Sequence, residues 1–548
     1  MDFPTISKFS KKIPRKGSGL YYDPLYGYVP LPDYIREAMD LEVFQRLRGI
    51  KQLSTVYLTF PGAVHTRFDH CVGTAYLSSI MFEKIRELVN PSEPDTPQLN
   101  LILEACMYLS SLFHDVGHGP FCHVFEMFCR REKKFSEWTH EKMGRKLITG
   151  KDENNVDIPN KAFKQIREFL EKIKNRFSLI EPDADNLELL SPSNIYNIAS
   201  GKSPELGEPN LDNKYYFLKD IIASSYGLDR LDYLKRDAYF SGVNTGNIDI
   251  GEIISSLLLI NFKGKYGLFL KSEAITALET LLQARNLVYR RLYHNSVHRS
   301  AQELIIRGLI SIRENPEKIC LFTDNEILTL FSEKGGLSTD INERVKFRIL
   351  FENIHLCNHL FIRKFKSELS RYSETEGEWI KLKNAEDSIA EEAGMNKDNV
   401  FYDTEIIPAV KSEDFTKEVF FDEIEGQPKS LFDLAEHLKM IYGGDVHPGY
   451  ERAEYFNESV SDIIVCFPYD SIIGKLEELK TKTDEDLTEG IETLYRDKIE
   501  PIIKGFFKNV LKVLETDGNF FKKAEIKKYF LQLKQKCFNY LLALAKPE

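Results

Sequence analysis

The sequence predicts a mainly α-helical protein with a smaller mixed α+β lobe in its C-terminal part. Apolar residues recur at helical spacing over long stretches between residues 21 and 310. After residue 310 this pattern weakens, and short β-type runs such as residues 418–421 stand in strongly charged sequence. We therefore expect a flexible basic tail over residues 1–20 and a helical core over residues 21–310. A helical or mixed lobe with a regulatory or oligomerising role is expected over residues 311–548.

The individual elements follow from apolar spacing and from the residues that interrupt it. Helices are expected over residues 33–47, 68–89, 101–113, 221–240 and 274–312. Residues 91–97 contain three prolines and residues 151–160 are polar, so both segments predict loops. Residues 260–270 alternate around a glycine turn, which predicts a β-hairpin. A basic, aromatic amphipathic helix is expected over residues 520–544.

Composition limits the class of protein further. The chain has 548 residues, of which 42% are hydrophobic and 29% charged, as is typical of a soluble globular protein. No apolar run approaches the roughly 20 residues that a membrane-spanning helix needs. The net charge of −11 argues against a generally basic nucleic-acid-binding surface. Eight cysteines without a C-x-x-C motif, and the lack of a signal-peptide pattern, predict a cytoplasmic protein with reduced thiols.

Histidine is concentrated in one part of the chain. Six of the twelve histidines fall between residues 65 and 140. The pair His114-Asp115 follows an apolar run and precedes a turn that contains glycine. Imidazole nitrogen and carboxylate oxygen suit a first-row divalent metal ion, and neither group is expected to be buried without a partner. This region therefore predicts a metal site.

A polar stripe is expected on one of the later helices. Asp229, Tyr233 and Asp237 are spaced i, i+4 and i+8, so they share one helix face. Such a face is too polar for a core, although a solvated charged face is an alternative interpretation. A second predicted helix repeats this spacing with Arg285, Tyr289 and Tyr293. There the alternative is an ordinary mixture of core and surface residues.

These residues also carry a family resemblance. His70, His114-Asp115 and Asp229 reproduce the H…HD…D signature of the HD-domain phosphohydrolases. The runs at residues 44–53, 60–63, 67–70, 113–121 and 138–141 are similar to the deoxynucleoside triphosphate (dNTP) triphosphohydrolase branch. The resemblance is to the catalytic core of the SAM- and HD-domain enzymes, without a SAM domain, and covers roughly residues 20–310. It implies a helical HD-domain core and metal-dependent hydrolysis of a dNTP to a deoxynucleoside and inorganic triphosphate.

The resemblance assigns roles to individual residues. The implied metal ligands are His70, His114, Asp115 and Asp229, which would accept Fe, Mn, Zn, Ni or Mg. The implied catalytic group is His118, His123, His140 and Glu126, with His123 as general acid for the 5′-oxygen. The implied triphosphate ligands are Arg67, Arg230 and Arg285. Gln52 and Asp237 match residues that bind the sugar 3′-hydroxyl, and Tyr233 and Tyr293 match aromatics that flank the sugar. Convergent Arg and His residues are what an acidic protein needs to bind a triphosphate, and histidine suits proton transfer near neutral pH.

A nucleotide effector and a homo-oligomer, dimer or tetramer, are also implied. Residues matching those of an effector site in the family are Asp40, Gln45, Arg48 and Arg291. Glu273 and Tyr22 stand where a lysine and an asparagine are expected, so the sequence predicts an altered effector preference. The alternative is that this region has become a plain contact between subunits.

Two other functions stay open at this point. One is an HD-type phosphodiesterase or nuclease acting on single-stranded nucleic acid, which the lysines and aromatics of residues 520–536 could attract. The other is a non-catalytic nucleotide sensor. The complete set of triphosphate-binding and sugar-binding residues favours the dNTP, and a sensor has no need of a general acid.

Overall fold

The computed structural model describes most of the first 346 residues and shorter stretches beyond them. The described residues are 20–90, 96–131, 135–182, 184–346, 351–355, 401–403, 418–422, 426–430, 464–468, 478–479, 484–501 and 504. The basic tail predicted over residues 1–20 lies almost entirely outside the described residues, and the amphipathic helix predicted over residues 520–544 lies wholly outside them. Within the described part of the chain, every helix is too short or too polar to span a lipid bilayer.

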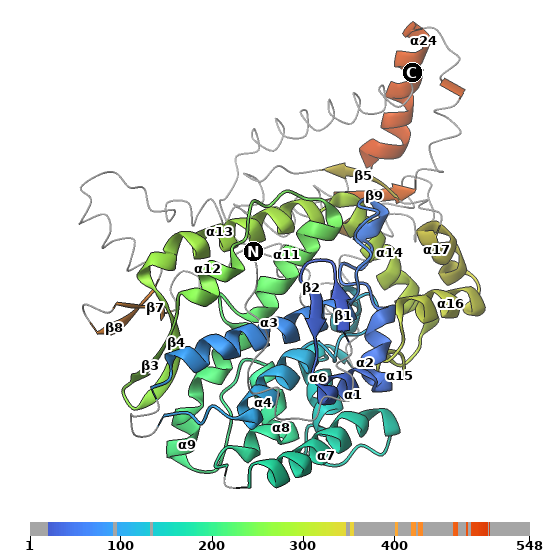
Figure 1. Cartoon of the computed structure of the whole chain (residues 1–548). Helices are drawn as coiled ribbons and strands as arrows, with labels where there is room; N and C mark the ends of the chain where they lie inside the picture. Colours follow the sequence, from blue (N-terminus) through green and yellow to red (C-terminus); the bar gives the residue numbers. More distant parts are fainter. Residues whose placement is uncertain are drawn as a thin grey trace, which may run out of the picture.

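The chain is mainly helical, as predicted (Figure 1). The helices of the first half are α1 (Asp33–Met39), α2 (Glu42–Gln45), α3 (Arg67–Leu88), α4 (Leu101–Phe113), α5 (His123–Arg131), α6 (His140–Thr149), α7 (Gln165–Ile180), α8 (Pro192–Ala199), α9 (Pro209–Lys214) and α10 (Asp220–Ala223). The later ones are α11 (Leu228–Ser241), α12 (Ile250–Ser255), α13 (Ile275–Val288), the π-helical turn η9 (Tyr289–Tyr293), α14 (Ser296–Ile312), α15 (Pro316–Ile319), α16 (Asp324–Lys334), α17 (Leu337–Lys346) and α24 (Asp484–Leu494).

In the described part of the chain, the strands form three small sheets. Their bounds are β1 (Leu20–Asp23), β2 (Gly27–Pro30), β3 (Leu257–Phe262), β4 (Lys265–Lys271), β5 (Phe351–His355), β6 (Phe401–Asp403), β7 (Glu418–Asp422), β8 (Gln427–Ser430) and β9 (Ile464–Pro468). β1 and β2 form an antiparallel hairpin. The second sheet has the order β3-β4-β7-β8, with β4 and β7 parallel, and the third has the order β5-β9-β6. The hairpin predicted over residues 260–270 and the strand predicted over residues 418–421 are both confirmed.

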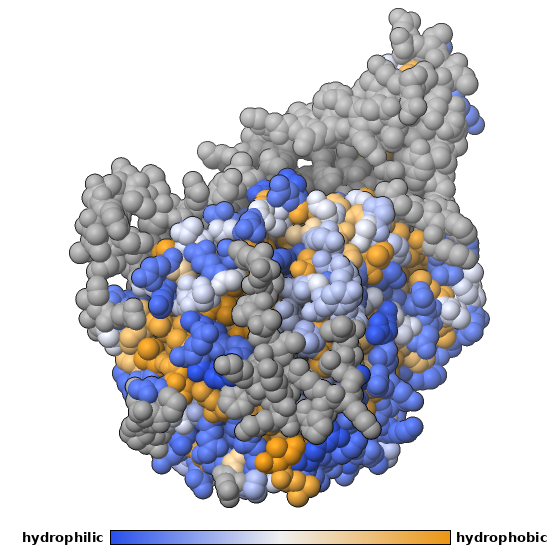
Figure 2. All heavy atoms as spheres, in the orientation of Figure 1, coloured by the Kyte–Doolittle hydropathy of each residue, from blue (hydrophilic) through white to orange (hydrophobic). Residues whose placement is uncertain are grey.

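Helices α3 and α4 lie at the centre of the core and pack against each other (Figure 1). α3 begins with a capping box, in which the Thr66 hydroxyl accepts from the Asp69 amide and the Asp69 carboxylate accepts from the Thr66 amide. Every residue of α4 is buried, Glu104 included, as expected for a largely apolar helix in the middle of a core. On the side of the molecule seen in Figure 2, the described residues are mainly hydrophilic, with an apolar area over β3 and β4. The predictions of helices over residues 68–89 and 101–113 are confirmed by α3 and α4.

Three predicted long helices are interrupted in the structure. Residues 33–47 form α1 and α2 because Leu41 has an extended backbone conformation. Residues 221–240 divide into α10 and α11. A Cβ atom at Gly227 would lie 2.0 Å from the Ile222 carbonyl oxygen, so only glycine allows this close turn. Residues 274–312 divide at η9, after which the Asn295 side chain accepts from the Val297 and His298 amides and starts α14. Apolar periodicity did not reveal these breaks.

Candidate active site

Two histidines present the same ring nitrogen to a common point. His70 lies in the first turn of α3, and its Nδ1 is 2.8 Å from a carboxylate oxygen of Asp232. His114 caps the C-terminus of α4, and its Nδ1 is 2.8 Å from the carbonyl oxygen of Ser111. A carbonyl oxygen only accepts, so Nδ1 of His114 carries the proton. The ionised Asp232 assigns the same tautomer to His70. In their neutral forms both rings therefore direct an unprotonated Nε2 inward.

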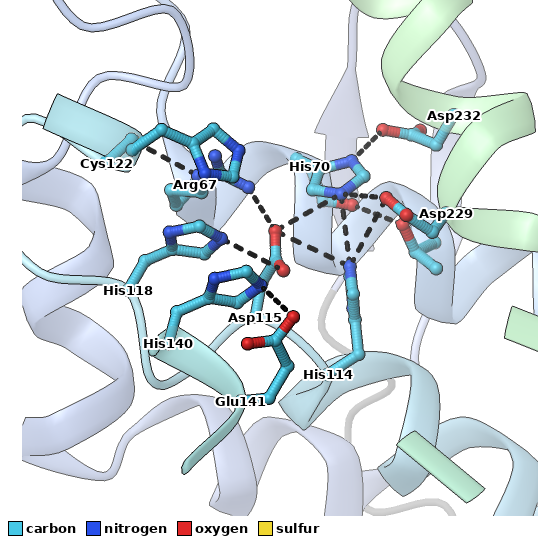
Figure 3. Close-up of polar contacts among 12 residues, drawn as sticks. Arg67, His70, His114, Asp115, His118, Cys122, His140, Glu141, Asp229 and Asp232 are labelled. Atoms are coloured by element: carbon cyan, nitrogen blue, oxygen red, sulfur yellow. Dashed lines mark hydrogen bonds and ion pairs between the residues drawn. The ribbon is translucent and has the colours of Figure 1, made fainter. Parts of the chain in front are cut away.

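Two carboxylates converge with these nitrogens (Figure 3). The two Nε2 atoms of His70 and His114 are 3.2 Å apart. Asp229 Oδ1 is 3.1 Å from His70 Nε2 and 3.6 Å from His114 Nε2. Asp115 Oδ2 is 3.6 Å from His70 Nε2 and 3.5 Å from His114 Nε2. His70 lies on α3, His114 caps α4, Asp115 follows that cap, and Asp229 lies in the first turn of α11. The packing of these helices therefore brings the four predicted ligands together.

This donor set fits a divalent metal ion. Ligand atoms that sit roughly 2.0–2.2 Å from a metal ion lie about 3–3.6 Å from one another, which matches the separations in the cluster. Two imidazole nitrogens facing each other at 3.2 Å repel each other unless a proton or a metal ion is bound between them. His70, His114 and Asp229 are close enough to hold an ion even without Asp115. Asp115 completes a set of two nitrogens and two oxygens, which suits first-row metals.

The electrostatics of the cluster keep its carboxylates ionised. Burial favours the neutral acid, but His114 and Arg67 hold the pKa of Asp115 well below its usual range. The buried Arg67 guanidinium also forms an ion pair with Asp115. Burial opposes the charge of His70, but hydrogen bonds to Asp229 and Asp232 raise its pKa to about 10. A proton therefore binds tightly where a cation is expected, and a metal ion would replace it.

A second group of imidazoles lies beside this cluster. The rings of His118 and His140 stack at 4.0 Å, and His118 Nε2 donates to Asp115 Oδ1 at 3.4 Å. Glu126, buried in the first turn of α5, accepts from His123 Nδ1 at 3.4 Å and from His140 Nδ1 at 3.2 Å. Burial and the positive charge of Arg67 hold the pKa of His118 well below its usual value. Burial lowers the pKa of His140, but its hydrogen bond to Glu126 and the charge of Glu141 outweigh that effect and raise it.

The loop before His123 has an unusual backbone. Phe121 and Cys122 have φ values of 58° and 55°, in the left-handed region that non-glycine residues rarely adopt. The buried carboxylate of Asp324 holds this turn, since it accepts from the Phe121 amide at 2.7 Å and from the Lys51 amide at 3.0 Å. The Cys122 thiol donates to the Lys51 carbonyl oxygen at 3.0 Å. The side chain of His123 is thereby placed at the pocket, with 64% of its surface exposed.

A pocket of about 400 Å³ opens over these two groups. The residues predicted to bind substrate all line it: Gln52, Arg67, Arg230, Tyr233, Asp237, Arg285 and Tyr293. It is also lined by His118, His123, His140, Asp115 and Asp229, and by a further arginine, Arg299. The volume is typical of small-molecule sites, and the arginines suit an anionic ligand. A smaller cleft of about 150 Å³, between α6, α8 and α10, reaches His114, Asp115 and Asp229.

The residues predicted at the sugar are already linked to one another. Asp237 is fully buried, accepts from His65 Nε2 at 2.8 Å and also accepts from the Tyr293 hydroxyl. Tyr289 and Tyr293 lie in η9, and their rings pack at 4.7 Å. The Arg285 guanidinium lies 5.3 Å from the centre of the Tyr289 ring. The predicted stripe Arg285, Tyr289 and Tyr293 thus lines one pocket, although a π-helical turn replaces the regular helix there.

The residues assigned to an effector site lie in two places. Gln45 donates to the Met39 carbonyl oxygen at 2.8 Å, and Arg48 Nε donates to Gln45 Oε1 at 2.9 Å. The exposed Asp40 directly follows Met39, so Asp40, Gln45 and Arg48 share one surface. Arg291 is exposed on η9. The structure of the single chain brings the first three together, and an effector site stays a prediction.

Sequence patterns missed one set of residues at this site. Asp232, Arg236, Asp23 and Tyr26 form a buried polar cluster behind His70. The i, i+4 spacing of Asp232 and Arg236 signals an ion pair on a helix. The contact of Asp232 with His70 depends on how α11 packs against α3, which spacing within one helix does not reveal.

Comparison with known proteins assigns the family. The HD domain matches residues 67–205, and an HD associated region matches residues 248–424. The chain is therefore an HD-domain protein, as the sequence motifs predicted, and it belongs to a superfamily of hydrolases.

Curated relatives share part of their length with this chain. It is 29% identical over 333 residues to an uncharacterized protein of Methanocaldococcus jannaschii. The matched region covers 61% of this chain and 58% of that protein. It is 26% identical over 361 residues to the deoxynucleoside triphosphate triphosphohydrolase SAMHD1 of Danio rerio, covering 62% of this chain and 54% of that protein. The chain thus spans about half the length of the curated relatives it matches.

A solved structure shares the fold. The crystal structure of a hypothetical protein from Aquifex aeolicus superposes with a TM-score of 0.52 at 22% identity, covering 83% of this chain and 98% of that chain. This likeness supports the architecture and says nothing of the substrate.

Proposed function

We propose that the protein hydrolyses deoxynucleoside triphosphates to a deoxynucleoside and inorganic triphosphate, with the help of a divalent metal ion. One observation carries the proposal: a single pocket of about 400 Å³ joins part of the two-His, two-Asp cluster to five histidines, four arginines and three tyrosines. A triphosphate carries several negative charges, and a pocket of convergent arginines in an acidic protein fits such a ligand. SAMHD1 of Danio rerio is named for this reaction.

The arginines would bind the phosphates and orient the α-phosphorus. Arg67 is fixed by Asp115, and Arg230 donates to the Ser225 carbonyl oxygen at 3.1 Å. Arg285 is held over the ring of Tyr289. Guanidinium groups that are already held lose little freedom when a phosphate binds, so they favour binding in one orientation.

Attack of water on the α-phosphorus would break the bond to the 5′-oxygen. His70, His114, Asp115 and Asp229 would hold the metal ion, which would polarise a phosphoryl oxygen and lower the pKa of water. The 5′-oxygen leaves as a hydroxyl when it receives a proton, and His123 would donate it. Glu126 orients His123 and His140 through its two hydrogen bonds. The water would supply its oxygen to the triphosphate and release a proton to solvent, and the deoxynucleoside would depart neutral with the proton from His123.

The experiment offers the purified full chain each dNTP and NTP, alone and in pairs, with Mn²⁺, Mg²⁺, Fe²⁺, Zn²⁺ or Ni²⁺. Chromatography separates triphosphate from pyrophosphate and phosphate. We expect deoxynucleoside and triphosphate in equal amounts, and pairs of nucleotides test the predicted effector. Release of pyrophosphate, cleavage of a single-stranded oligonucleotide without dNTP hydrolysis, or nucleotide binding without turnover would each contradict the proposal.

Tyr293 is expected to select deoxyribose. Its ring lines the pocket, and its hydroxyl is held by the buried Asp237. A ribose 2′-hydroxyl buried against such a ring without a partner costs roughly 1–3 kcal/mol, or about a 5- to 150-fold preference in kcat/KM. Tyr293→Ala should reduce the dGTP over GTP ratio of kcat/KM, and likewise for the other bases. Tyr293→Phe, which keeps the ring, is the matched control and should retain most of the preference.

A further inference from the structure

A buried charged cluster lies behind His70, away from the pocket. Arg236 is fully buried in α11 and contacts two carboxylates, those of Asp232 and Asp23, each at 2.9 Å. Both carboxylates are at most 1% exposed. Burying three charged groups is costly even when they are paired, and none of these side chains lines the 400 Å³ pocket. The cluster therefore has a role other than contact with the substrate.

Asp232 connects this cluster to the metal ligands. Its Oδ2 accepts from His70 Nδ1 at 2.8 Å and from Arg236 Nε at 2.9 Å. Its Oδ1 accepts from the Tyr26 hydroxyl at 2.8 Å and from Arg236 Nη2 at 2.9 Å. Four donors fix the carboxylate, and the carboxylate fixes the orientation and tautomer of the His70 ring (Figure 3). His70 Nε2 is thereby held toward His114 and Asp229.

The other end of the cluster belongs to the N-terminal hairpin. Asp23 ends β1, and its Oδ1 accepts from the Leu25 and Tyr26 amides at 2.8 and 3.3 Å, which closes the turn before β2. Its Oδ2 lies 2.9 Å from Arg236 Nη1. Tyr26, in the same turn, packs against Tyr76 of α3 with ring centres 5.4 Å apart. One short turn thus supplies two of the groups that hold Arg236 and Asp232.

Helix α3 has a glycine where the side chains of Asp232 and Arg236 pack against it. A Cβ atom at Gly73 of α3 would lie 2.1 Å from Asp232 Oδ1 and 2.2 Å from Arg236 Nη2. Only glycine therefore leaves room for the ion pair against α3. The cluster can be disturbed at this point without removing any charge.

We propose that Asp232 is a positioning residue for the metal ligand His70, and that the turn of the N-terminal hairpin sets the metal affinity of the site through Asp23, Tyr26 and Arg236. The inference rests on the metal site of the proposed function and not on the identity of the nucleotide. It makes the hairpin, which contributes no ligand, part of the metal-binding machinery. A change in the hairpin would then alter how tightly the ion is held.

The test measures the dissociation constants of Mn²⁺ and Co²⁺ for the full chain by competition with a chelator. Asp232→Asn should weaken binding about 10- to 100-fold, as expected when the partner of a ligating histidine is lost. Tyr26→Phe removes one hydrogen bond to Asp232 and should weaken binding about 2- to 10-fold. Asp23→Asn and Gly73→Ala should act in the same direction, and the visible spectrum of bound Co²⁺ should change in Asp232→Asn.

Tyr215→Phe is the matched control. Tyr215 is fully buried, and its hydroxyl accepts from the Gln98 amide at 2.9 Å and lies 3.4 Å from Asp185, in a part of the fold without metal ligands. The Tyr215→Phe variant should lose thermal stability much as Tyr26→Phe does, while its metal affinity stays within twofold of the wild type. If Asp232→Asn does not fold, the metal affinity of Tyr26→Phe, compared with that of Tyr215→Phe, decides whether the hairpin sets the metal affinity.

Equal metal affinity in wild type, Tyr26→Phe and Asp232→Asn, with only thermal stability reduced, would overturn the proposal and leave the cluster a structural role. The measurement uses the metal ion alone. A protein that binds Mn²⁺ as expected but does not hydrolyse dNTPs would therefore contradict the proposed function and leave this inference standing.

Discussion

At the scale of single residues, the hydrogen bonds made by Nδ1 of His70 and of His114 decide which ring nitrogen can bind a metal ion. The Ser111 carbonyl oxygen and the Asp232 carboxylate fix the tautomers of His114 and His70, so two lone pairs face one point. The four ligands could be predicted because their residue types and order form a recognisable series. Asp232 could not, because its role arises only where α11 crosses α3.

Loss of a metal ligand should abolish activity without unfolding the protein. His114→Ala or Asp115→Ala removes one of four ligand atoms, and Asp115→Ala also leaves the buried Arg67 without its ion pair. We expect metal content near zero, no detectable hydrolysis, and a far-ultraviolet circular dichroism spectrum like that of the wild type. Elemental analysis gives the metal content. Full hydrolysis in a metal-free variant would refute the metal-assisted mechanism.

His123 should affect turnover more than binding. Proton donation to a leaving group typically contributes ~10²–10⁴-fold to the rate, so His123→Ala should lower kcat by that factor while nucleotide and metal affinity change little. His123→Gln keeps polarity but does not supply the proton, and should be equally slow. Because the side chain is 64% exposed, added imidazole should restore part of the rate in His123→Ala.

The opposite result would reassign this residue. If His123→Ala binds nucleotide poorly but has a normal rate at saturation, then His123 is a binding residue and another group donates the proton. Glu126, which accepts from both His123 and His140, makes His140 the next candidate.

At the scale of elements, the interruptions of the helices place the functional side chains. The turn at Gly227 puts Asp229 in the first turn of α11, where it reaches the two histidines. The π-helical turn η9 directs Tyr289 and Tyr293 into the pocket. Apolar spacing predicted continuous helices here, because the residues on both sides of each break keep the same period. The breaks depend on close backbone approach and on caps, which local hydrophobicity does not encode.

The loop between the HD pair and α5 depends on a residue far along the chain. Asp324, in the first turn of α16, accepts from the amides of Phe121 and Lys51. Asp324→Ala would leave two buried amides unpaired, at a cost of roughly 1–3 kcal/mol, and would release Phe121 and Cys122 from their left-handed conformations. We expect lower kcat with metal affinity unchanged, measured with the chelator assay and steady-state kinetics.

A control separates loop placement from general destabilisation. Asp157→Ala removes an exposed acidic residue that pairs with Arg167 at the surface. Such a surface pair typically contributes about 1 kcal/mol or less, so kcat should hardly change in this variant. If Asp324→Ala loses stability but keeps its wild-type kcat, the turn does not place His123.

At the scale of the whole molecule, the C-terminal part of the chain is joined to the core. β7 pairs in parallel with β4, so a strand from the predicted C-terminal lobe extends a sheet begun by the core hairpin. Val419 and Phe420 belong to the same hydrophobic cluster as α3 and α4. The two strand segments were each predicted from their own sequence. Their pairing was not, because register between segments so far apart is decided by tertiary packing and not by local pattern.

This joining predicts how the protein unfolds. Phe420 is fully buried in the shared core, and Phe420→Ala should cost about 3–5 kcal/mol through lost burial and the cavity that remains. If the strand stabilises the core, the temperature at which bound Mn²⁺ is released should fall together with the unfolding temperature seen by circular dichroism. Leu179→Ala, at a site 85% exposed near the end of α7, is the control and should change the stability by no more than about 0.5 kcal/mol. A Phe420→Ala protein whose metal release is unchanged would instead mean that the C-terminal strands fold separately from the HD domain. The metal signal distinguishes the two outcomes because every predicted metal ligand lies before residue 230, whereas the described contacts of Phe420 are with β4, β8 and the core beneath them.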